Sequence, residues 1–137
     1  MTTPEECRER FPDDPEIADE VPLFRRIPPW HFVCDENDGS YRPSSAAFED
    51  DDDGDPMSVY RADVLKSEGG RPERVMIGHP GFGLVAVTAG TMRHKEQTVH
   101  PDPLPEESSH TLVCGPKTRA TRRFFARQSV WIIPPPD

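Results

Sequence analysis

Two histidines and two cysteines stand in pairs whose residue types suit a metal ion. Two residues separate His31 from Cys34, and three separate His110 from Cys114. Imidazole nitrogens and thiolate sulfurs are the usual ligands of tetrahedral zinc. In an extended strand, however, residues three apart face opposite sides, so His31 and Cys34 diverge unless the chain turns between them. A structural zinc module is therefore an alternative, and the plainer prediction is two buried thiols and two polar histidines near strand ends.

A basic segment further along has the composition of an anion site. The sequence Gly-Pro-Lys-Thr at 115–118 precedes an expected helix, whose free N–H groups and positive dipole end would lie beside Lys117 and Thr118. It is not a P-loop, because the two-glycine spacing is absent. We predict a solvated surface or an intrachain partner for the chain's own acidic run at 49–55, and the alternative is a phosphate or nucleic-acid site. The predicted anion- or partner-binding residues are Lys117, Thr118, Arg119, Arg122 and Arg123.

The acidic run at 49–55 holds six carboxylates in seven residues. Counted from Glu49, the residues Glu49, Asp51 and Asp53 take the first, third and fifth positions of a calcium loop. The twelfth position is Tyr60, which cannot supply the bidentate carboxylate that such a loop needs. Because the like charges repel one another, we predict a solvated loop.

A scattered polar set begins with an arginine-bearing strand and continues through an Arg/Ser turn to a Ser-x-Tyr strand, all within residues 23–65. This order resembles small ADP-ribosyltransferase-like toxins of the RES type, and the resemblance implies an enzyme that uses NAD. The chain lacks their Gly-Gly-Arg-Trp stretch, and none of Glu96, Glu106 and Glu107 can be placed as the catalytic acid. The resemblance assigns to such a site Arg26, Tyr41, Arg42, Ser58 and Tyr60.

No nucleophile can be selected from spacing alone. Five histidines and three cysteines offer many chance pairs, so no Ser-His-Asp or Cys-His set stands out. Cys34 and Cys114 lie in apolar segments, where we expect inert, buried thiols. With Cys7 the cysteine count is odd, and residues 1–20 are polar and acidic rather than a signal peptide. We therefore predict free thiols, a reducing cytoplasmic location and no bound cofactor.

Seventeen prolines in 137 residues divide the chain into short elements. Hydrophobic residues make up 34% of the chain and charged residues 30%, which suits one modest core. We predict one small α+β domain over 21–137, rich in loops and proline, after an acidic flexible segment at 1–20. One clear C-terminal helix is expected at 118–128, and residues 83–93 fit either a strand or a helix. Short strands are expected at 23–27, 30–34, 57–60, 110–114 and 130–133.

Hydrophobic residues of these elements form the predicted core. No stretch of the chain approaches the ~18 apolar residues that a membrane span needs, so we predict no membrane partner. The core candidates are Trp30, Phe32, Phe48, Val59, Val75, Ile77, Leu84, Val85, Leu112, Val113, Phe124, Trp131 and Ile132.

Charge is divided unevenly along a chain whose net charge is −9. Residues 1–56 carry −12, residues 57–109 carry −1 and residues 110–137 carry +4. The overall sign argues against non-specific nucleic-acid binding, because the phosphates would be repelled. Two charged faces favour another protein as the partner. The sequence leaves open the oligomeric state, and whether the run at 49–55 pairs with the basic helix at 117–127 within one chain or between chains.

Five sequence blocks carry a wider resemblance: RRIPPWH at 25–31, RPSSAAF at 42–48, DPMSVY at 55–60, DPLPEESSHTLV at 102–113 and GPKT at 115–118. Together they resemble a set of small uncharacterised bacterial proteins, which implies a stand-alone bacterial domain and no particular activity. We therefore predict a small bacterial cytoplasmic binding or accessory protein that acts through charged surfaces and lacks a complete catalytic set. The NAD-using enzyme and the zinc module are the alternatives.

Overall fold

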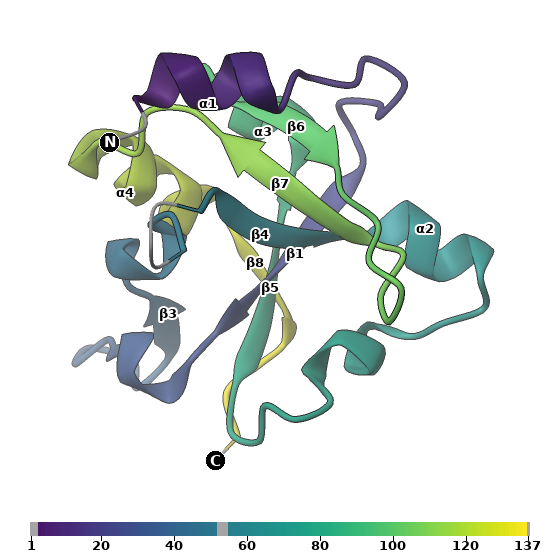
Figure 1. Ribbon diagram of the computed structural model, residues 1–137. Helices are drawn as coiled ribbons and strands as arrows, with labels where there is room; N and C mark the ends of the chain where they lie inside the picture. The colour runs from purple at the N-terminus through teal and green to yellow at the C-terminus, as the bar shows by residue number, and fades with distance from the viewer. Residues whose placement is uncertain (1–2, 52–54, 137) are drawn as a thin grey trace.

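A six-stranded antiparallel sheet organises residues 3–51 and 55–136, which are the residues that the computed structural model describes. The strand order is β6-β7-β4-β1-β5-β8, and β2 pairs with β3 in a separate hairpin (Figure 1). The strands are β1 (Pro22–Ile27), β2 (Phe32–Cys34), β3 (Tyr41–Pro43), β4 (Met57–Arg61), β5 (Gly83–Thr88), β6 (Thr98–Pro101), β7 (His110–Cys114) and β8 (Val130–Ile133).

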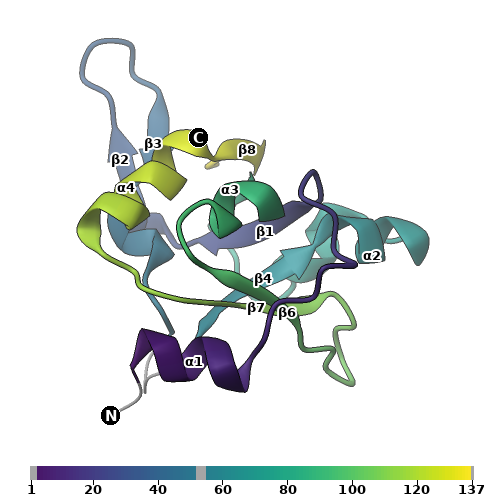
Figure 2. The ribbon, with the colours of Figure 1, turned by 90° about the horizontal axis from the view of Figure 1, so that it is seen from above.

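Short helices cover the sheet. Figure 2 shows α3 and α4 on one side of β7 and α1 on the other. Among the helices of the described ranges, none is long and apolar enough to cross a membrane. The α-helices are α1 (Pro4–Arg10), α2 (Ala62–Ser67), α3 (Ala89–Arg93) and α4 (Arg119–Gln128), and the 3₁₀ helices are η1 (Pro29–His31), η2 (Ser45–Phe48) and η4 (Pro72–Met76).

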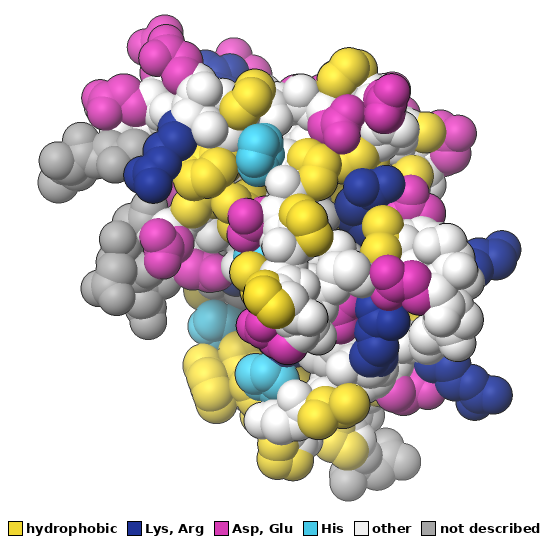
Figure 3. Space-filling view, turned by 45° about the vertical axis from the view of Figure 1, so that its right-hand side comes forward, with side chains coloured by type: hydrophobic (Ala, Val, Ile, Leu, Met, Phe, Trp, Pro, Cys, Tyr) yellow, Lys and Arg dark blue, Asp and Glu magenta, His cyan; other side chains and the backbone are white. Residues whose placement is uncertain are grey.

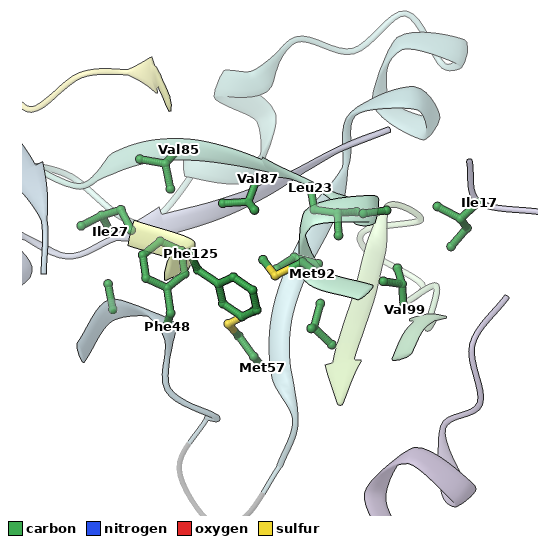
Figure 4. Packing of buried hydrophobic residues seen from close by; sticks show 14 residues of the cluster. Ile17, Leu23, Ile27, Phe48, Met57, Val85, Val87, Met92, Val99 and Phe125 are labelled. Carbon is green, nitrogen blue, oxygen red and sulfur yellow. The ribbon is translucent and has the colours of Figure 1, made fainter. Parts of the chain in front are cut away.

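Alternation along the central strands creates two different faces of the sheet. One face packs against α3, α4 and η2, where the rings of Phe48 and Phe125 meet edge-on with centroids 6.3 Å apart. Figure 4 shows these two rings beside Met57 of β4. The opposite face holds a smaller apolar cluster that includes Phe24 and Tyr60. Ser58 shares that second face with Tyr60, because the two residues are two apart on β4.

Strands β1 and β4 pair over only two positions, Leu23 with Arg61 and Phe24 with Tyr60. Beyond them the strands diverge, as Figure 1 shows. The guanidinium of Arg25 bridges this divergence and donates a 2.8 Å hydrogen bond to the carbonyl oxygen of Ser58. Burial lowers the pKa of Arg25, and the nearby Asp51 opposes this change. The charged side chain of Arg25 thus takes the place of backbone hydrogen bonds between β1 and β4 where these two strands diverge.

The predicted fold class is confirmed, and several elements lie where the residue pattern placed them. Thr118 caps α4 by accepting a hydrogen bond from the backbone N–H of Thr121 at 3.2 Å. The ambiguous stretch at 83–93 contains both alternatives, strand β5 and then helix α3, with Thr88 capping the helix. The strand expected at 30–34 begins only at Phe32, because residues 29–31 form the 3₁₀ helix η1.

Three core candidates are wrong. Trp30 is 75% exposed, Ile77 is 79% exposed and Ile132 is 38% exposed. Trp30 lies in the turn that follows Pro28, and Ile77 follows directly after η4. Ile132 points outward from the edge strand β8, whose residues alternate between exposed and half-buried. Hydrophobic character alone therefore did not predict burial for residues next to a proline-started 3₁₀ helix or on an edge strand.

The described part of the acidic segment at 1–20 packs on the sheet. Ile17 is 1% exposed and belongs to the main core cluster. Asp13 accepts hydrogen bonds from the backbone N–H of Val99 at 2.8 Å and from Arg93 Nε at 3.0 Å. Flexibility of this segment stays a prediction, and so does a domain boundary at residue 21.

The contribution of this segment can be measured with two matched isoleucine variants. We expect Ile17→Ala to lower the free energy of unfolding by about 2–4 kcal/mol, because it empties a fully buried site. Ile77→Ala should change it by less than about 0.5 kcal/mol, since that side chain is exposed. Chemical denaturation of the full chain measures both. Equal, small effects would mean that residues 3–20 do not pack on the domain in solution.

Candidate functional site

Three ion pairs bind the described end of the acidic run to the rest of the chain. The pairing between acidic run and basic helix is therefore formed within one chain. Asp52, Asp53 and Gly54 lie outside the described residues, and with them part of the calcium-loop pattern. The pairs are Glu49–Arg122 at 3.1 Å, Asp50–Lys117 at 2.9 Å and Asp51–Arg25 at 3.3 Å, and we call them the 49–51 clamp.

Lys117, a predicted anion-binding residue, is used inside this clamp. Its side chain is only 7% exposed, and its ammonium donates to the carbonyl oxygen of Val113 at 3.0 Å. Burial lowers the pKa of Lys117, whereas the carboxylate of Asp50 acts in the opposite direction. Thr118 is occupied as the cap of α4, and Arg122 by Glu49. Arg119 and Arg123 are exposed on the helix surface and form no ion pair within the described residues.

A hollow of about 510 Å³ between α4 and the β2–β3 hairpin collects three arginines. Arg123 and Arg127 are one helical turn apart on α4, and Arg42 approaches from β3. Within residues 3–51 and 55–136, none of these three forms an ion pair, and no carboxylate lines the hollow. We call it the basic groove. The remaining lining residues are Val33, Pro43, Ser44, Ser45 and Ala126.

Aromatic contacts position the hairpin that brings Arg42 to this groove. The indole N–H of Trp131, on β8, donates to the carbonyl oxygen of Tyr41 at 3.0 Å. The ring of Phe32, on β2, meets the Trp131 ring edge-on at 6.0 Å. Ser44 caps η2 and so fixes the chain direction after β3. The sequence prediction missed the groove because Arg42 lies far from α4 in the chain.

A second hollow, of about 550 Å³, lies on the opposite face of the sheet, and we call it the polar cleft. Arg26 is one of its lining residues: Nη2 donates to the Tyr60 hydroxyl at 2.5 Å, and the guanidinium lies 4.9 Å from that ring centroid. Burial raises the pKa of Tyr60, and Arg26 opposes this. Figure 3 shows acidic and basic side chains intermingled on the face that carries α2 and the loop before β7. One such pair at the cleft is Arg74 with Glu107, at 2.6 Å.

The polar cleft contains part of the set that the ADP-ribosyltransferase resemblance assigns. Arg26, Ser58 and Tyr60 line it together, whereas Tyr41 and Arg42 lie on β3 in the separate hairpin. Arg42 faces the basic groove instead. The structure therefore does not gather these five residues into one nucleotide pocket.

A hydrogen-bonded array that spacing did not reveal crosses β4 and β7 at the cleft. Ser58 Oγ lies 3.1 Å from His110 Nε2, and His110 Nδ1 lies 3.0 Å from Asp102 Oδ2. Ser58 also donates to Asp51 Oδ2 at 2.7 Å. The period-2 pattern of β4 signals that Ser58 and Tyr60 share a face, but only the β4–β7 register brings His110 beside them.

The structure does not gather the four zinc candidates into one site among the described residues. His110 is bound in the array just described, and Cys34 is exposed rather than buried as predicted. Cys114 is buried beside Cys7. Burial raises the pKa of the Cys114 thiol most, and the neighbouring Cys7 raises it further. No three His, Cys, Asp or Glu side chains in the described ranges are arranged to hold a metal ion.

The 49–51 clamp can be tested by neutralising one carboxylate. Asp50→Asn leaves the buried Lys117 ammonium unpaired, so we expect a loss of about 1–2 kcal/mol at pH 7, between the values of exposed and buried pairs. Since the folded-state pKa of Lys117 is lowered, the unfolded chain binds more protons above that pKa. Stability of the variant should therefore rise relative to the parent toward pH 10, and the loss should shrink.

Asp55→Asn is the matched control, because Asp55 is exposed and forms no ion pair within the described residues. Urea unfolding at several pH values measures both variants. A loss that is equal in the two variants, or that does not change with pH, would contradict the assignment of Lys117 to Asp50.

Comparisons with protein-family models, with curated proteins and with solved structures give no match for this chain. The resemblance to small bacterial proteins accordingly stays a prediction. What the chain does has to be argued from the geometry of the two hollows.

Proposed function

We propose that this chain is a binding protein that recognises an acidic segment of another protein through the basic groove. One observation carries the proposal: Arg42, Arg123 and Arg127 meet in one hollow without a described counter-charge, on a chain whose net charge is −9. Three like charges in one hollow repel one another unless an anion joins them. A ligand that carries carboxylates is therefore expected to bind most favourably in the groove, where it would offset this repulsion.

Arginine suits this role better than lysine would. Its planar guanidinium offers paired N–H donors that match both oxygens of a carboxylate. Arg123 and Arg127, four residues apart on α4, can meet acidic side chains from the helix side, while Arg42 meets them from β3. Val33, Pro43 and Ala126 add apolar surface that can contact the aliphatic parts of the peptide's side chains.

A short acidic segment fits the groove better than a nucleic acid does. A duplex carries one charge per ~1.7 Å and would extend beyond the hollow over a protein surface that is negative overall. A peptide can confine its few carboxylates to the groove. The proposal includes a cytoplasmic location, which the three free cysteines support, although the oligomeric state is not part of it.

Binding can be measured by fluorescence anisotropy with a labelled octaglutamate peptide at low salt. We expect the double variant Arg123→Gln/Arg127→Gln to weaken binding at least about tenfold, because charge-assisted hydrogen bonds contribute about 1.5–3 kcal/mol each. The matched control is Arg119→Gln, which changes an exposed arginine of the same helix outside the groove. It should bind the peptide like the parent protein.

Two outcomes would overturn the proposal. One is a parent protein that binds octaglutamate no more tightly than the double variant. The other is a loss of peptide affinity in Arg119→Gln that equals the loss in the double variant, which would mean that net charge rather than the groove determines binding. Added salt should weaken the specific complex, since the pairs are solvent-exposed.

A further inference from the structure

We propose that Ser58, His110 and Asp102 form a catalytic triad that hydrolyses small acyl esters in the polar cleft. This activity lies beyond the proposed binding function and uses the opposite face of the sheet. The three residues come from β4, from β7 and from the loop before β7, so only the fold brings them together.

Hydrogen bonds fix the orientation of the His110 ring. Nδ1 faces two acceptors of Asp102, the carboxylate oxygen at 3.0 Å and the backbone carbonyl oxygen at 3.1 Å. Nδ1 therefore carries a proton, and in the neutral ring Nε2 is left as the acceptor. The His110 side chain is only 11% exposed, and Nε2 lies 3.1 Å from Ser58 Oγ. A base oriented by a carboxylate and placed against a hydroxyl is the arrangement that activates a serine.

Asp51 holds the serine in the free protein. The Ser58 hydroxyl donates to Asp51 Oδ2 at 2.7 Å, and Asp51 is itself bound by Arg25. Rotation about the Cβ–Oγ bond redirects the proton to His110 Nε2, which already lies within hydrogen-bond reach. The change needs no movement of heavy atoms.

Tyr60 and Arg26 supply the stabilisation that an oxyanion needs. Tyr60 lies two residues after Ser58 on the same face of β4, a rise of about 6.6 Å. Because Arg26 Nη2 donates to the phenol oxygen, the phenol's own proton is left for another acceptor. Burial raises the pKa of Tyr60, so this proton is retained at neutral pH. A phenol polarised by a guanidinium is a strong donor to a developing negative charge.

The reaction follows from these positions. Ser58 Oγ attacks the ester carbonyl carbon while its proton passes to His110 Nε2, and the carbonyl oxygen becomes an oxyanion facing Tyr60. The bond to the alcohol oxygen then breaks, and His110 returns the proton to the leaving alcohol. Water repeats the sequence on the acyl-serine, giving its proton to His110, and the acid departs as the serine is restored.

The lining of the cleft indicates a short acyl group. Its volume of about 550 Å³ is modest, and Val75, Ile77 and Leu104 provide an apolar wall. Two arginines, Arg26 and Arg74, and two glutamates, Glu106 and Glu107, line the cleft, so their charges cancel and favour no ionic substrate. An uncharged ester of a small carboxylic acid therefore fits best.

A fluorophosphonate probe tests the serine directly, because its phosphorus accepts Oγ and releases fluoride. We expect one adduct per chain, mapped to Ser58 by peptide mass spectrometry, and none in Ser58→Ala. His110→Gln should slow labelling at least about 100-fold, the range that a positioned general base supplies. Ser108→Ala, a neighbouring serine bound to Glu68 outside the triad, should label like the parent.

The parent protein alone can refute the proposal. Folded parent protein that gains no adduct, or gains it at a residue other than Ser58, overturns it whatever the variants do. A parent that releases no 4-nitrophenol from 4-nitrophenyl acetate above the rate of Ser58→Ala overturns it as well. The variant Arg123→Gln/Arg127→Gln should keep full labelling, so failure of the groove and failure of the triad are distinguishable.

Discussion

The guanidinium of Arg25, in the opening between β1 and β4, joins η2, which borders the basic groove, to β4, which borders the polar cleft. It satisfies carbonyl oxygens of Ala47 and Ser58 and at the same time binds the carboxylate of Asp51. A strand pair that diverges normally leaves backbone groups unpaired in a buried region. Here the half-buried guanidinium of Arg25 closes the opening and anchors the 49–51 clamp to the sheet.

The clamp determines which charges stay available. It binds Lys117, just before α4, and Arg122 on the helix, whereas Arg123 and Arg127 face the groove without a described partner. It also holds the carboxylate of Asp51 against Ser58, a residue that lines the polar cleft. Acidic residues of the N-terminal part therefore pair with basic residues of the C-terminal part within one chain. Three arginines without a described ion pair line the basic groove.

Local signals predicted the elements well and the sites poorly. Thr118 and the sequence VWII at 130–133 act through neighbours in the chain, so helix α4 and strand β8 lay where expected. Trp30 failed because the prolines before it impose a turn that apolar character does not reveal. The contact between Ser58 and His110 joins residues 52 apart, and it depends on strand register, which spacing does not encode.

The most direct test of this division of charge is the reactivity of individual arginines. Brief modification with phenylglyoxal, followed by peptide mapping, gives a rate for each guanidinium in the folded protein. The account predicts that Arg42, Arg123 and Arg127 react at least about tenfold faster than Arg25 and Arg122, which opening of the clamp would have to expose first. Equal rates for the two groups would contradict it, because the clamp would then not hold in solution.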